Sequence, residues 1–550
     1  MDDGTPSTGR SNPQPAENVS QPVLPDDEES LTAAESDGVL EESTSSNASR
    51  EQDTHADGYT PGHTYGTAPK PTDGVPETTI TTTNPPPRAL APDLLRGLLM
   101  ALMAMDHNVI GLNSWPHSTG PDPMESDSAP VLRWNRPLGY AVRTLSHLCA
   151  PGFTLLLGVG VVYFARSRSR MGWSAARMAR HFAARAAVLT ALSVAMGFVL
   201  TQGQLWFMNI VLVALAVDYL LVGLLWLGIA ETEPLLASAV DRWVVSGDAP
   251  AEETPLLGRR SKSADGGASA RAQSLSWHVH NALLLVLAFV TIWWNHWLSP
   301  THGVCATSTS PSPSTTDSSS TTASDFWRFW FYEVSSPRVL SGFPPLAWLS
   351  FAVLGLLYAR VVIKARHLPR RRWPPATSPQ ASPSPSSSSS RASCASGISP
   401  RGACAARPDA NPYLVSAASF FYVVKYPPDF AFFAYTLAAV FFLLGVLGMI
   451  PGRVATRRLG PLLAFGTSAL FFYVMHLVVL FGLSILVTVR LFGHDNGLPP
   501  QMPGTPAVGV DNVVVWWANW AVVMGVMYPL CRWYSAFKKT RSADSVWRFF

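Results

Sequence analysis

The segment RALAPDLLRGLLMALMAMDHN, residues 88–108, is apolar enough to begin a membrane helix, yet it contains Asp93, Arg96, Asp106 and His107. Such groups are costly in hydrocarbon unless each has a partner or a task. A His side chain can accept and return a proton near neutral pH or carry an acyl group, and a carboxylate can orient it. The segment therefore predicts acid–base or acyl-transfer chemistry within a membrane protein.

Four residues of this segment fall on one stripe of a helix: Arg96, Met100, Met103 and His107. The ends of the stripe lie about 16 Å apart at 1.5 Å per residue. Because neighbouring residues point in different directions, Asp106 and His107 cannot pair locally, and each should find a partner on another element. Asp93 and Arg96 are three residues apart, so they either pair at the membrane interface or bind a ligand such as a cofactor.

Other apolar segments contribute further candidates: His147 in TLSHLCAPGF, Lys425, Tyr426 and Asp429 in KYPPD, and Tyr473 and His476 in FFYVMHL. We expect a polar cluster in which Asp106, His107 and His147 are catalytic and the others support them or bind substrate. Structural alternatives remain open. His147 could be solvated at the interface, His476 could link two helices by a hydrogen bond, and Lys425 and Asp429 could form a surface ion pair at a proline turn.

The composition predicts a multi-pass membrane protein. Apolar residues make up 47% and charged residues only 14% of the 550 residues, and apolar windows of about 20 residues recur, which is the length of a membrane span. A scattered net charge of +3 does not suggest a nucleic-acid partner. The five Cys are far apart and lack CxxC spacing, so we expect neither disulfides nor a metal site.

We expect an all-α transmembrane bundle of about ten spans. The windows are 89–112, 144–165, 181–201, 205–229, 279–299, 343–364, 411–426, 429–449, 460–489 and 511–535. The basic segments RSRSRMGWSAARMARHFAAR, KARHLPRRRWPP, GRVATRR and CRWYSAFKKTR predict a cytosolic location for these loops and for both termini. This arrangement requires 411–426 to cross the membrane, although its short length also permits a re-entrant segment.

The remaining segments have biased compositions. Residues 1–87 are acidic and rich in Ser, Thr and Pro, which predicts a disordered cytosolic tail. We expect a transmembrane domain over 88–538, with disordered loops near 230–277, 300–325 and 368–410, and a cytosolic tail over 539–550.

Several motifs, in their order along the chain, resemble the heparan-alpha-glucosaminide N-acetyltransferase catalytic-domain family, particularly its bacterial and fungal membrane branch. They are RALAPDLLRGLLMALMAMDHN, TLSHLCAPGFTLLLGVG, FPPLAWLSFAVLGLLYAR, KYPPDFAFFAYTL, FGTSALFFYVMHL and MYPLCRWYSAFKK. The resemblance covers about residues 88–550. It implies an enzyme that takes acetyl from cytosolic acetyl-CoA and passes it to an amino sugar across the membrane.

On this resemblance, Arg96 and Asp93 would serve the acetyl-CoA phosphates, and His107 or His147 would lie where the acetyl group is transferred. The family's His-Ala-Ser-Trp-Asn-Gly motif between the first two spans has no counterpart in RWNRPLGYAVRTLSH, so the two His residues take its place by position only. Asp429 stands where Ser is usual after KYPP, and Thr467 stands where Arg often follows Gly.

Two other function classes fit the same features. The charged residues could line the path of a transporter that makes no bond, or the long tails could belong to an inactive scaffold. The partners expected are the lipid bilayer, a sugar or amino-sugar acceptor and, as an option, a second copy of the chain. The segments ETEPLL (231–236) and EETPLL (252–257) resemble acidic dileucine signals for a vacuolar or lysosomal membrane.

Overall fold

The computed structural model describes residues 90–121, 125, 131–201, 203–209, 211–247, 268–297, 326, 329–331, 334–336, 338–366, 415–423, 425, 428, 430–500, 507–541, 545 and 547. All of them belong to one unit, Pro85–Phe550. The predicted tail over 1–87 and the predicted disordered loops near 300–325 and 368–410 lie outside the described residues. Of the disordered loop predicted near 230–277, residues 230–247 and 270–277 are helical instead.

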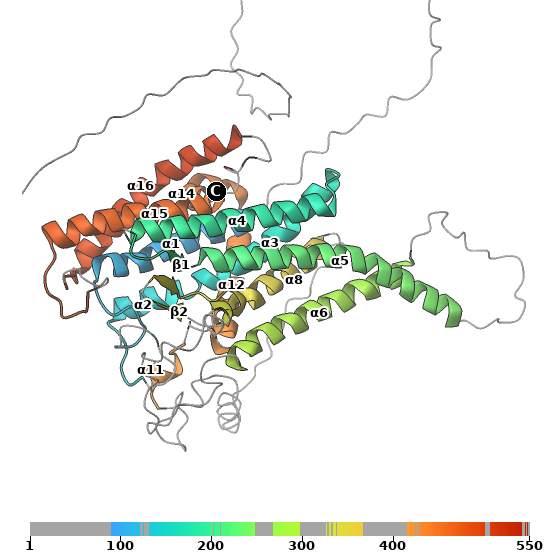
Figure 1. Ribbon diagram of the computed structural model, residues 1–550, viewed down its shortest axis with the longest axis horizontal. Helices are drawn as coiled ribbons and strands as arrows, with labels where there is room; N and C mark the ends of the chain where they lie inside the picture. Colours follow the sequence, from blue (N-terminus) through green and yellow to red (C-terminus); the bar gives the residue numbers. More distant parts are fainter. Residues whose placement is uncertain are drawn as a thin grey trace, which may run out of the picture. The chain divides into compact units, whose positions relative to one another are not determined.

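Long helices that run alongside one another form the described part of the chain (Figure 1). The main helices are α1 (Leu90–Leu112), α2 (Pro137–Ser146), α3 (Cys149–Arg170), α4 (Ala175–Leu200), α5 (Leu212–Gly247), α6 (Ala270–Trp297), α8 (Leu349–Arg366), α12 (Phe430–Gly448), α15 (Ala469–Ile485) and α16 (Val513–Lys539). Shorter elements are η1 (Pro345–Trp348), α11 (Ala417–Phe420), α13 (Gly452–Arg458), α14 (Gly460–Thr467) and the π-helical turn η3 (Leu486–Leu491).

Eight helical segments within the described residues are long and apolar enough to cross a membrane. They are Pro137–Arg170, Ala175–Leu200, Leu212–Trp243, Ala270–Asn295, Pro345–Ala365, Phe430–Gly448, Ala469–Thr488 and Val513–Lys539. An integral membrane protein with a helical bundle is the architecture that such segments build. The predicted count of about ten spans is not confirmed.

Two of the ten predicted spans account for the difference. The first, α1, has the necessary length, but its charged residues lower its hydropathy and it is not among the eight. The second, predicted at 411–426, appears in its described residues 415–423 only as the four-residue helix α11. Ser416 Oγ donates to Val131 O at 2.6 Å, and Ser419 Oγ accepts from Val131 N at 3.3 Å, so this segment packs on the loop that follows α1.

Helix α1 is the central element for the site, and it defines the two ends of the bundle. We call the end that holds Leu90 the proximal end and the end that holds Leu112 the distal end. Gly97 and Gly466 bring the backbones of α1 and α14 into contact, because a Cβ on Gly97 would lie 1.9 Å from Leu462 O and one on Gly466 would lie 1.9 Å from Asp93 O. Only glycine permits so close a helix–helix approach.

Contacts along α1 fix the direction of its neighbours. The helices α14 and α15 run parallel to α1, since Gly466 contacts Asp93 and His476 contacts His107. The helix α16 runs the opposite way, from Trp516 near Asn108 to a basic last turn at the proximal end. The basic stretch at 538–539 therefore lies at the proximal end, and so does 453–458, since Gly452 lies beside Leu90.

A small sheet, absent from the all-α prediction, lies beside the start of α5. Its strands are β1 (Phe207–Asn209), β2 (Val334–Ser335) and β3 (Val339–Ser341), in the order β1-β3-β2, with β1 parallel and β2 antiparallel to β3. The Asn209 side chain donates to Ser341 Oγ and to Phe343 O at 3.0 and 2.8 Å. The predicted span 460–489 is also divided, since Ser468 separates α14 from α15.

Candidate functional site

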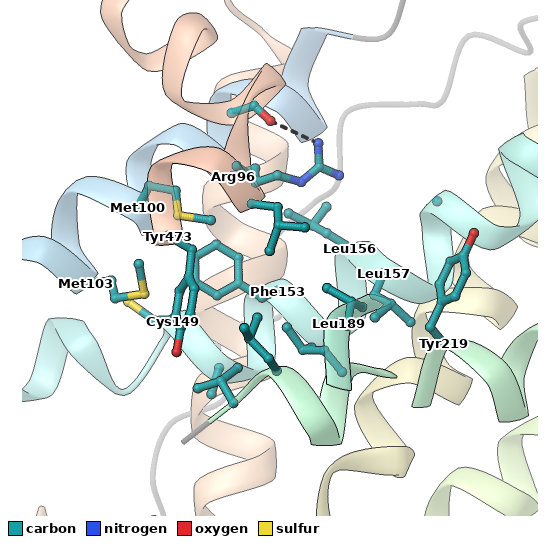
Figure 2. A pocket seen from close by; sticks show the side chains of 18 of the residues that line it. Arg96, Met100, Met103, Cys149, Phe153, Leu156, Leu157, Leu189, Tyr219 and Tyr473 are labelled. Atoms are coloured by element: carbon teal, nitrogen blue, oxygen red, sulfur yellow. Dashed lines mark hydrogen bonds between the residues drawn. The ribbon is translucent and has the colours of Figure 1, made fainter. Parts of the chain in front are cut away.

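A cavity of about 430 Å³ lies between α1, α3, α4, α5, α15 and α16. All four residues of the predicted stripe line it: Arg96, Met100, Met103 and His107. Figure 2 shows Arg96, Met100 and Met103 following one another along α1, with Tyr473 and Cys149 beside them and Tyr219 on the opposite side. The stripe is therefore one wall of a cavity that extends from Arg96 to the level of His107.

A His–carboxylate pair occupies the distal part of this cavity. Asp106, on α1, is buried, and its Oδ2 lies 2.9 Å from Nε2 of His117, which belongs to the loop after α1. The guanidinium of Arg143, on α2, approaches both groups, with Nη1 at 2.9 Å from His117 Nε2 and at 3.6 Å from Asp106 Oδ2. Asp106 and His117 line the cavity, and the His117 side chain is 25% exposed.

The two contacts of His117 Nε2 correspond to different proton positions. With the proton on Nε2, the ring donates to Asp106, and with the proton on Nδ1, Nε2 accepts from Arg143. Because a carboxylate stabilises the proton on the nitrogen that faces it, the first arrangement leaves the lone pair on Nδ1. Nδ1 makes no hydrogen bond within the described residues. In this first arrangement the pair presents a nitrogen that can accept a proton, whereas the Arg143 contact, in which the guanidinium can only donate, requires the second.

A second buried carboxylate holds Arg143 in place. Glu125 Oε1 accepts from Arg143 Nε at 2.8 Å, and Oε2 accepts from Nη2 at 2.5 Å. His147 Nε2 lies 3.2 Å from the same Oε1. Burial raises the pKa of Glu125, but the charge and hydrogen bonds of Arg143 and the hydrogen bond of His147 outweigh this effect and lower the pKa below its ordinary value. Glu125 is therefore ionised and fixes the guanidinium beside His117.

His107 and His476 form a chain of hydrogen bonds whose proton positions can be deduced. His476 Nδ1 lies 3.0 Å from Phe472 O, and a carbonyl can only accept, so Nδ1 carries the proton. Neutral His476 then accepts at Nε2, which lies 2.9 Å from His107 Nδ1. His107 must therefore donate from Nδ1, and its lone pair is on Nε2. The two rings are stacked, with centroids 5.2 Å apart.

The structure brings most of the predicted residues to one region. Asp106 and His107 each have a partner on another element, as expected. Lys425 and Tyr473 are buried and line the cavity. Tyr426 and Asp429 lie outside the described residues.

Asp93 and His147, two of the predicted residues, do not line the cavity. Asp93 and Arg96 pair at 2.9 Å, and Arg96, 27% exposed, also donates to Gly466 O at 3.4 Å (Figure 2). His147 is fully buried and is not among the residues that line the cavity. Its Nε2 contacts Glu125, which in turn binds Arg143.

Sequence reasoning did not select His117, Glu125 or Arg143. All three lie between α1 and α3, outside the apolar cores of the predicted spans. Ionisable residues are common in such connecting segments, so their presence there did not indicate a site. A signal was present, since Asp106 required a partner on another element and the stretch that follows α1 contains a His at residue 117. Their burial, with side-chain exposures of only 2% for Glu125 and 4% for Arg143, is a tertiary property.

Among the described residues, no group of three or more His, Cys, Asp or Glu side chains is arranged to hold a metal ion. Cys149 and Cys531 are buried free thiols. Comparison with protein-family models and with curated proteins finds no match to this chain.

Proposed function

We propose that this chain is a membrane acyltransferase, which moves an acyl group from an acyl-CoA at the proximal end to an acceptor at the distal end. The observation that carries the proposal is one cavity that joins the cationic wall at Arg96 to the Asp106–His117 pair. The sequence resemblance described above supports acetyl-CoA as donor and a sugar or amino sugar as acceptor.

The cationic walls of the cavity suit a phosphorylated donor. Arg96, Arg185 and Lys538 line it from three helices. Arg185 Nε is buried and makes no hydrogen bond within the described residues, which leaves it ready to bind an anion. Asp93 orients Arg96 through the ion pair. In the proposal, these cations bind the CoA phosphates and direct the thioester toward His117.

The chemical step is general base catalysis of acyl transfer. His117 Nδ1 accepts a proton from the acceptor amine or hydroxyl as that group forms a bond to the thioester carbonyl carbon. The C–S bond then breaks, and the CoA thiolate takes up the proton. The products are an amide or ester and CoA thiol. Asp106 stabilises the imidazolium, and the Lys425 ammonium is suited to the transient oxyanion.

His107 is the second base in this proposal, because it has a lone pair on Nε2 and lines the same cavity. His147 contributes through Glu125, which positions Arg143. His476 fixes the proton position of His107. These roles differ from the sequence prediction, in which His107 and His147 were the leading catalytic residues.

The proposed topology places the proximal end in the cytosol, since loops rich in Lys and Arg remain there. Both termini are then cytosolic. The proposal of a vacuolar or lysosomal location rests on the segment EETPLL alone, which lies outside the described residues. The other segment, ETEPLL, is part of α5, and its Glu233 pairs with Arg360 at 2.7 Å, so it is not an extended signal.

The test uses purified full-length protein in lipid vesicles with labelled acetyl-CoA and glucosamine. We expect label on the sugar, and a decrease of 10²-fold or more in His117→Ala, the range for loss of a general base. His494→Ala is the matched control, because His494 is an exposed distal His that pairs with Asp511 and does not line the cavity. Label trapped on the protein would indicate an acyl-His route, whereas unchanged acetyl-CoA or sugar inside the vesicles would favour a transporter.

A further inference from the structure

The cavity has a polar part and an apolar part. The polar part contains Asp106, His107, His117 and Lys425. The rest, which we call the apolar limb, extends sideways between α3, α4 and α5. It is lined mainly by Phe153, Leu156, Leu157, Leu189, Leu212 and Leu215, and Arg185 on α4 and Tyr219 on α5 line the cavity from the same two helices. Figure 2 shows Phe153, Leu156, Leu157 and Leu189 between the α1 side of the cavity and Tyr219.

The apolar limb is open at Gly160. This residue lines the cavity, and a Cβ at its position would meet no atom within 4 Å. Phe153, Leu156, Leu157 and Gly160 repeat at helical spacing, so they form one face of α3 that is about 10 Å long at 1.5 Å per residue. An acetyl group at His117 would leave this space unused, whereas the cavity as a whole, at about 430 Å³, is in the size range that binds molecules of drug size.

We propose that the apolar limb holds the hydrocarbon chain of a donor whose acyl group is longer than acetyl, so that the protein uses medium-chain acyl-CoA. This inference rests on the proposed function and extends its range of donors. Gly160 determines the chain length, because any larger side chain there would project into the limb. Burial of apolar carbon in such a limb increases affinity with each added methylene.

Continuity of the limb with the site favours an acyl donor over a lipid from the bilayer. The limb and the Asp106–His117 pair belong to one cavity, and Arg96, Arg185 and Lys538 line that same cavity. A medium-chain acyl-CoA matches all three features: phosphates for the cations, a thioester for His117 and a hydrocarbon chain for the limb. A phospholipid offers only oxygen esters, which are weaker acyl donors than a thioester.

The experiment measures the binding of acetyl-CoA and octanoyl-CoA to the full-length protein in nanodiscs, and then transfer from each donor. We expect octanoyl-CoA to bind at least tenfold more tightly, since each buried methylene is worth up to about fourfold in affinity. Gly160→Phe should remove this preference while acetyl-CoA binding persists. Gly228→Phe, on α5, is the matched control, because a Cβ there also meets no atom within 4 Å and Gly228 does not line the cavity.

The outcomes separate this inference from the proposed function. Equal affinity for the two donors, or a preference that survives in Gly160→Phe, would overturn the inference even where acetyl transfer occurs. A preference lost only in Gly160→Phe would support it. The same result without transfer from either donor would support the hydrocarbon site and refute the acyltransferase. Mass spectrometry that finds only a bilayer lipid in the limb, with no displacement by octanoyl-CoA, would also overturn it.

Discussion

Glu125 is expected to be the main stabilising residue of the loop after α1, and Glu125→Gln tests this. The carboxylate makes two hydrogen bonds to Arg143, at 2.8 and 2.5 Å, and both side chains are at most 4% exposed. The substitution leaves a buried guanidinium, which lies 3.6 Å from Asp106. Removing one partner of a buried ion pair costs about 3–5 kcal/mol, and we expect about 3 kcal/mol here because Gln keeps one acceptor oxygen.

The assay is reversible unfolding in mixed micelles with increasing SDS, followed by circular dichroism. Glu231→Gln is the control, since Glu231 is exposed on α5 and such changes usually stay within about 0.5 kcal/mol. Combining Glu125→Met with Arg143→Met should cost less than the sum of the two single changes, because no buried charge of this pair remains. A loss below about 1 kcal/mol in Glu125→Gln, or strict additivity of the Met variants, would refute the reasoning.

Three further predictions concern pH, packing and the second His pair. Folding lowers the pKa of Glu125, so the unfolded chain binds this proton more tightly than the folded protein does. The stability that Glu125 contributes is therefore full above its ordinary pKa of 4.5 and is lost as the pH decreases below that value. When unfolding is measured from pH 6 to 3, stability should fall less steeply in Glu125→Gln than in the wild type. Gly97→Ala should cost about 1–3 kcal/mol, because its Cβ would meet Leu462 O at 1.9 Å, whereas Gly160→Ala should be neutral or stabilising in the same unfolding assay. His476→Ala should lower kcat and shift the pH profile of kcat, because it frees the His107 Nδ1 proton. His476→Gln should restore part of the kcat and part of the pH profile. Equal effects of the two variants would count against the deduced hydrogen-bond chain.

Apolar patterning predicted the helices well. Most of the expected windows coincide with described helices to within a few residues, as at 429–449 and α12. The helical stripe of α1 was also predicted, because its spacing alone places Arg96, Met100, Met103 and His107 on one face. Local periodicity is sufficient for such features.

Features that depend on contacts between distant segments could not be predicted. The segment 415–423 reads as apolar, yet Ser416 and Ser419 bind the loop at Val131 and form only a short helix in this part. His117 and Glu125 look like ordinary loop residues until Asp106 and Arg143 are placed against them. The pairing of His107 with His476 joins residues 369 positions apart, which no local pattern encodes.

The central claim is that one cavity carries an acyl group from a donor at the proximal end to an acceptor at the distal end. The most direct measurement uses vesicles in which the protein has a single orientation, with labelled acetyl-CoA on the proximal side and glucosamine sealed on the distal side. The account predicts labelled N-acetylglucosamine on the distal side in the wild type and at least 10²-fold less in His117→Ala. Product on the proximal side alone, or label that crosses as unchanged acetyl-CoA, would contradict it.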